Sequence, residues 1–130
     1  MRMIQPKAAL SASLVALALS GCSGEKAPTK EDGVKVVEGF FTEQGRQATL
    51  QRSWRFEVTD AGGLDLDCEK KPNGDQECML GGSVKAQGSI GGQPTKPEPS
   101  TLKPKLRALF RPQGEGWQVV EVTDEGTSAG

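Results

Sequence analysis

The sequence predicts an α+β domain in which one N-terminal helix packs on an antiparallel sheet of about five strands. Three observations support this prediction. A stretch with a helix-capping sequence and a helical apolar period comes first, segments with a period of two follow, and turn-forming sequences separate these segments. Because short turns make consecutive strands antiparallel neighbours, the helix should cover the apolar face of the sheet.

The helix is expected to begin after Thr29 and to end at Gly45. Thr29 is a hydroxyl cap, Asp32 follows three positions later, and Pro28 precedes the cap. Apolar residues then recur at spacings of three and four: Val34, Val37, Phe40 and Phe41. Such a stripe indicates a helix with one buried face, and glycine is typical just beyond a helix end.

Strands are expected where apolar and polar residues alternate. The inward residues of the first are Leu50, Trp54, Phe56 and Val58. The others cover residues 64–69, 78–90, 106–110 and 117–122. Glycine-rich or proline-containing turns separate most of these segments. The polar connection from Gly91 to Thr101 contains three prolines and is expected to be exposed and irregular.

The N-terminal 21 residues have the organisation of an export signal. A basic start with Arg2 and Lys7 precedes an apolar run over residues 8–19, which is too short to span a bilayer as a helix. At its end, Leu19-Ser20-Gly21-Cys22 resembles the lipobox of bacterial lipoproteins. The alternative is an ordinary secretory signal followed by a chance cysteine.

The lipobox resemblance implies cleavage before Cys22 and fatty acyl chains on that cysteine, which hold the protein on a membrane. Residues 22–28 would be a flexible tether, residues 29–123 the domain and residues 124–130 a frayed tail. Lipoproteins retained in an inner membrane often carry aspartate where this chain has Ser23. The resemblance therefore favours the outer membrane of the bacterial cell envelope, facing the periplasm.

Two segments of the mature domain are similar to small NTF2-like (cystatin-like) envelope lipoproteins. They are the helical "VVEGFF" of residues 36–41 and the final "ALFRPQGEGWQVVEV" of residues 108–122. That resemblance implies a cone-shaped pocket between helix and sheet, suited to a small ligand. A plain β-meander or small barrel with one helix is the alternative architecture.

The composition excludes several classes of function. The chain has no histidine and no tyrosine, which excludes Ser/His/Asp and Cys/His catalysis and any zinc site built on imidazole. Without the positive charges of Arg2 and Lys7, the net charge changes from −1 to −3, and no basic stripe remains for nucleic acid. We therefore expect a protein that is not an enzyme, has no cofactor and binds no nucleic acid.

Cys68 and Cys78 are the two cysteines that remain when Cys22 is assigned to lipid. An even pair in an exported chain, on the inward parity of adjoining strands, predicts a disulfide. The alternative is a redox pair, but the spacing lacks the CxxC arrangement that lowers a thiol pKa.

Three further patterns have structural explanations that we favour. The carboxylate and amide groups that could coordinate a calcium ion are those of Asp65, Asp67, Glu69, Asn73, Asp75 and Glu77. They match no calcium-binding loop and suit a solvated sheet face. Ser100 and Lys103 match a Ser-x-x-Lys motif, but Pro104 and a predicted strand oppose the helical turn it needs. Trp54 and Trp117 are interpreted as core residues.

The leading hypothesis is a membrane-anchored module that binds or assembles with an envelope protein or another envelope component. An exposed apolar patch or an unpaired edge strand would support it. The alternative is a small-ligand carrier, which needs a deep apolar cavity between helix and sheet. An enzyme that uses only carboxylates or lysine ranks last, because the sequence shows no convergent set of such groups.

Overall fold

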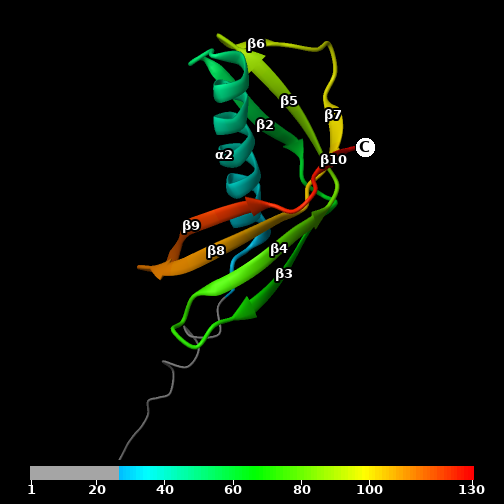
Figure 1. Cartoon of the computed structure of the whole chain (residues 1–130). Coiled ribbons are helices and arrows are strands. Elements are labelled where there is room, and N and C mark those ends of the chain that lie inside the picture. Colours follow the sequence, from blue (N-terminus) through cyan, green and yellow to red (C-terminus); the bar gives the residue numbers. More distant parts are fainter. Residues whose placement is uncertain (1–26) are drawn as a thin grey trace, which may run out of the picture.

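The computed structural model describes residues 27–130, which form one helix and two antiparallel sheets (Figure 1). Helix α2 spans Lys30–Thr49. The strands are β2 (Trp54–Asp60), β3 (Leu64–Lys70), β4 (Gln76–Gly82), β5 (Val84–Ile90), β6 (Gln93–Pro94), β7 (Ser100–Lys103), β8 (Leu106–Gln113), β9 (Gly116–Asp124) and β10 (Ser128–Ala129). The α+β class is confirmed, with more strands than the five expected.

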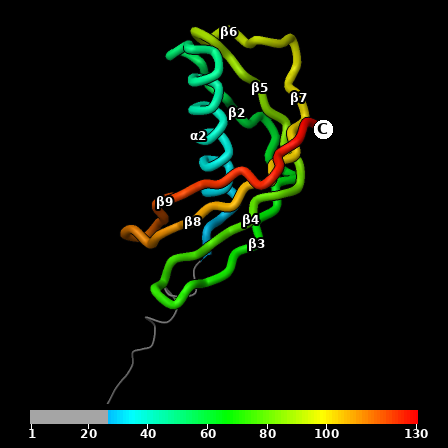
Figure 2. Tube along the Cα trace, viewed as in Figure 1, coloured from blue at the N-terminus to red at the C-terminus, as the bar shows by residue number. Residues whose placement is uncertain are grey.

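One sheet has four strands in the order β3-β4-β8-β9, and the other has the order β10-β7-β5-β2 with β6 beside β5. The two sheets are halves of one meander. Leu80 pairs with Leu106 in the first sheet, and Val84 pairs with Leu102 in the second. From the first pair to the second, each strand advances by four residues, so the register is continuous across the two sheets. Four long strands therefore bend from one sheet into the other beside α2 (Figure 2).

The bend between β4 and β5 depends on a close approach of two glycines. Gly82 has a φ of 82°, and a side chain there would meet the Gly63 carbonyl. The Ser83 N–H donates to the same carbonyl over 3.0 Å. Glycine is required at position 82 because only it combines the positive φ with this contact.

The core lies between α2 and the inner face of the four-stranded sheet. Val37 is fully buried and Val36 almost so, whereas Val34, Phe40 and Phe41 of the expected stripe are partly buried around them. Strand residues fill the centre: Leu64, Cys78, Leu80, Val84, Leu106, Ala108 and Phe110. The apolar parity predicted for these strands is confirmed.

The helix begins as predicted but ends later. Thr29 and Asp32 form a reciprocal capping box, whereas the helix continues through Gly45 to Thr49. A glycine occupies this position inside the helix because the indole of Trp54 packs where any larger side chain would be. Leu50, expected to face inward from a strand, is instead the helix C-cap and is 87% exposed.

Two other expectations are corrected in the C-terminal half. The connection from Gly91 is exposed up to Ser100 as predicted, but it contains the short strands β6 and β7. The expected frayed tail contains β10, in which Ser128 pairs with Lys103 of β7. The Asp124 side chain holds the turn before β10 by accepting N–H bonds from the turn backbone.

Candidate functional site

The predicted cysteine roles have different outcomes. Cys22, the expected lipid attachment site, lies outside the described residues. Cys68 and Cys78 form the predicted disulfide, with an S–S distance of 2.03 Å. They are directly opposed on β3 and β4, so the bond joins the two strands of the first hairpin.

The acidic residues considered as calcium ligands do not converge. Within residues 27–130, no group of three or more histidine, cysteine or acidic side chains could hold a metal ion. The acids of β3 lie on its exposed side. Glu77 instead accepts a salt bridge of 3.3 Å from Lys71. The hydrogen bond to Glu77 and the nearby negative charge of Glu69 raise the pKa of Lys71 above its ordinary value.

Asp75 has a structural role that the sequence did not reveal. Its carboxylate is buried and lies 3.3 Å from the Arg111 guanidinium of β8, while the Asn73 side chain donates to it. A buried carboxylate is stable only when it is paired and hydrogen-bonded. This pair therefore fixes the β3–β4 turn against β8.

The other sequence candidates also fit structural roles. Ser100 and Lys103 lie on the extended strand β7, so the helical turn of a Ser-x-x-Lys site is absent there. The indole N–H of Trp54 donates to the Phe41 carbonyl over 3.2 Å. The Trp117 ring is partly buried and packs edge-on against Phe110. Both tryptophans therefore belong to the packing of the domain.

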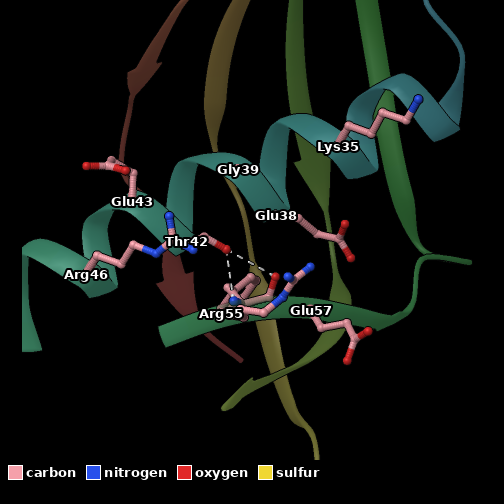
Figure 3. A pocket seen from close by; sticks show the side chains of 9 residues that line it. Lys35, Glu38, Gly39, Thr42, Glu43, Arg46, Arg55 and Glu57 are labelled. Atoms are coloured by element: carbon pink, nitrogen blue, oxygen red, sulfur yellow. Dashed lines mark hydrogen bonds between the residues drawn. The ribbon is translucent and has the colours of Figure 1, made fainter. Parts of the chain in front are cut away.

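A polar groove of 370 Å³ runs between α2 and β2 (Figure 3). Three side chains of α2 reach the backbone of β2 across it. The Glu38 carboxylate accepts from the Val58 N–H over 2.9 Å. The Thr42 hydroxyl accepts from the Phe56 N–H over 2.9 Å and donates to the Phe56 carbonyl. The third group is the Arg46 Nε, which donates to the Trp54 carbonyl over 3.1 Å.

The spacing of these contacts follows from the two secondary structures. Four helical residues rise about 6.0 Å, and two strand residues rise about 6.6 Å. Because α2 and β2 run in opposite directions, every fourth helix residue meets every second strand residue. The helix therefore binds the outer edge of β2, the last strand of its sheet.

Neither this groove nor the hollow beside Trp54 resembles the deep apolar cavity expected for a small-ligand carrier. The groove between helix and sheet is lined mainly by charged side chains: Lys35, Glu38, Glu43, Arg46, Arg55 and Glu57. A more apolar hollow near Trp54 and Ala86 has a volume of only 180 Å³, whereas ligand pockets occupy about 300–1,000 Å³.

Strand β9 is an end strand of the four-stranded sheet. It pairs with β8, and no strand of residues 27–130 pairs with its other side. Leu109 pairs with Glu121 and Phe110 with Val119, so Val120 is an extra residue that forms a β-bulge. Val119 and Val120 are 39% and 43% exposed.

The edges at β2 and β3 carry protection that β9 lacks. Natural proteins protect sheet edges with covering elements, charged side chains or prolines. Helix α2 covers β2, and β3 carries four charged residues among its seven. Between its ends β9 has one charged residue, Glu121, and neither a basic residue nor a proline. The bulge is the edge-protecting feature that β9 retains.

Comparisons with protein-family models, with curated proteins and with solved structures find no match to this chain. In the part of the chain that the structure describes, no helix is long and apolar enough to cross a membrane. The resemblances to the lipobox and to NTF2-like lipoproteins therefore stay predictions. The candidate site rests on the geometry of β9.

Proposed function

We propose that the mature chain is a lipid-anchored protein of the bacterial cell envelope that binds a protein partner through β9. The observation that supports binding is the open edge of β9 with its exposed pair Val119 and Val120. The resemblance of Leu19-Ser20-Gly21-Cys22 to a lipobox supports the anchor, and Ser23 after the cysteine favours the outer membrane, on its periplasmic side.

The anchor and the domain would be joined by the short tether of residues 22–28. Two or more acyl chains at about 0.8 kcal/mol per buried CH₂ give a stable attachment. Anchoring confines the domain to the same surface as membrane-associated partners, which raises their local concentration. A modest affinity at the β9 edge is therefore sufficient for binding.

The edge suits an extended peptide segment of the partner. Such a segment adds to a sheet edge through main-chain hydrogen bonds, and side-chain contacts give specificity. Val119 and Val120 would contact apolar residues of the segment. Glu121, the one charged residue between the ends of β9, favours a segment that carries a basic residue opposite it.

Binding is favoured over catalysis because of how the charged groups are used. In the groove, Glu38 and Arg46 bind the backbone of β2. At the hairpin turn, Asp75 is paired with Arg111. These groups hold the helix against β2 and the hairpin turn against β8, which is a structural use of charge.

The anchor is tested by the intact mass of the protein purified from membranes of its native host, before and after reduction and alkylation. A product that begins at Cys22 with added acyl mass is expected, with two thiols alkylated only after reduction. An unacylated product would overturn the anchor.

The interface is tested by replacing Val120 with a photoreactive amino acid in the full-length lipoprotein in host membranes. Irradiation should join it to one defined protein. Val119→Lys should reduce this adduct at least tenfold, whereas Thr59→Lys, which adds the same charge beside the covered edge of β2, should not. The absence of an adduct, or equal loss in both variants, would overturn binding at β9.

A further inference from the structure

We infer that the C-terminal tip of α2 is a second docking surface, which binds an acidic protein surface with an apolar pocket for Leu50. The tip consists of Arg46, Leu50 and Arg52. It lies at the helix end and is defined by observations independent of those on β9.

Leu50 is unfavourable for the fold in two respects. Its backbone is left-handed, with φ 59° and ψ 27°, and it is the one non-glycine residue with positive φ among residues 27–130. Glycine is the usual residue at such a helix end because a side chain disfavours this conformation. The leucine side chain is also 87% exposed, so it gains almost no burial. Neither the helix cap nor the core explains a leucine here.

The tip is held in place by hydrogen bonds. The Leu50 N–H donates to the Arg46 carbonyl over 2.9 Å. The Thr49 hydroxyl donates to the Gly45 carbonyl over 2.7 Å and accepts from the Gln51 N–H. A side chain presented from a fixed backbone loses less conformational entropy on binding. The leucine is therefore a preorganised apolar anchor.

The charges beside Leu50 indicate the chemistry of its partner. Arg46, Leu50 and Arg52 line an open hollow of 610 Å³ together with Glu43 and Gln47. The lining includes two arginines and one glutamate, so its side chains give an excess of positive charge. Guanidinium groups bind carboxylates through paired hydrogen bonds. A surface with acidic residues around an apolar pocket would complement the tip.

The tether length favours a protein partner over the protein's own membrane, an argument that rests on the proposed anchor at Cys22. The 20 residues of α2 span about 30 Å. The connection from Cys22 to Thr29 reaches at most about 25 Å. An upright helix with its tip in the membrane is therefore out of reach. A helix lying flat would bring exposed acids such as Glu31 and Glu43 to anionic headgroups.

The test places a photoreactive amino acid at Gln51 of the full-length lipoprotein in host membranes, so that Leu50 is kept. A protein adduct is expected, and its cross-linked peptide should contain acidic residues beside apolar ones. Arg52→Glu should reduce the adduct at least tenfold, whereas Arg52→Lys should retain most of it. Purified wild-type protein should compete for the adduct, and Leu50→Gly, which should fold at least as stably, should not.

Several results would overturn the inference. They are an adduct with lipid, no adduct, a peptide without acidic residues, or equal competition by Leu50→Gly. Because the cross-linking position at Val120 is separate, failure at Gln51 with an intact adduct at Val120 would remove the tip and leave the β9 proposal standing. If the mass measurement shows an unacylated protein, the tether no longer distinguishes a protein partner from the membrane. That result is obtained independently of the cross-linking.

Discussion

Thr42→Val tests whether the hydrogen bonds between α2 and β2 stabilise the domain. The Thr42 hydroxyl accepts from the Phe56 N–H over 2.9 Å and donates to the Phe56 carbonyl over 3.4 Å, in a partly buried position. Valine has nearly the same shape and a similar helix propensity. The substitution therefore removes the hydrogen-bonding group and leaves the packing almost unchanged.

The expected loss follows from the backbone N–H that is left without its partner. An unsatisfied buried donor costs about 1–3 kcal/mol. Because water can enter the open groove, we expect the lower half of this range, about 1.5 kcal/mol. For a domain of this size such a loss lowers Tm by about 6–12 °C.

Urea unfolding followed by tryptophan fluorescence measures the difference, since Trp54 reports on β2. The matched control is Thr59→Val, which removes an exposed hydroxyl that bonds to the Lys85 carbonyl. Surface changes of this kind fall within about 0.5 kcal/mol. If the two variants lose equal stability, the helix side chains do not stabilise the β2 edge, and our explanation of the groove is wrong.

Three further substitutions or treatments give definite expectations. Gly45→Ala should destabilise the domain by about 2 kcal/mol in urea unfolding, because the new methyl group overlaps the Trp54 indole; a more stable variant would contradict this contact. Reducing the bond between Cys68 and Cys78 should cost about 2.8 kcal/mol, measured by thermal unfolding with and without reductant; an unchanged Tm would contradict it. Backbone N–H bonds lower the pKa of Asp124 below its ordinary value of 3.8. The stability advantage of the wild type over Asp124→Asn should therefore be complete above pH 3.8 and disappear as the pH falls below the lowered pKa. Unfolding curves that show the same difference at all pH values would refute this expectation.

The sequence predicted features that depend on neighbouring residues. The helix start was correct because Thr29 and Asp32 form a capping box within four positions. The disulfide followed from the parity of Cys68 and Cys78 around one turn. In both cases the interacting groups are close in the chain, so local patterns contain the information.

The errors came from long-range contacts. Gly45 was interpreted as a helix end, but its role is to admit the indole of Trp54, which arrives from the next element. Leu50 fitted the strand alternation by chance, although the chain had not yet left the helix cap. The open edge at Val120 could not be predicted, because a bulge is defined by the register of two strands.

The continuous register of the meander has a consequence for how the chain folds. Each long strand pairs with its neighbour in sequence, so most loops that must close during folding are short and their entropic cost is low. The packing of α2 beside β9 joins the two ends of the domain and has the longest loop to close. The hairpins and the packing of α2 on β2 can therefore form first, and the packing of α2 beside β9 can follow.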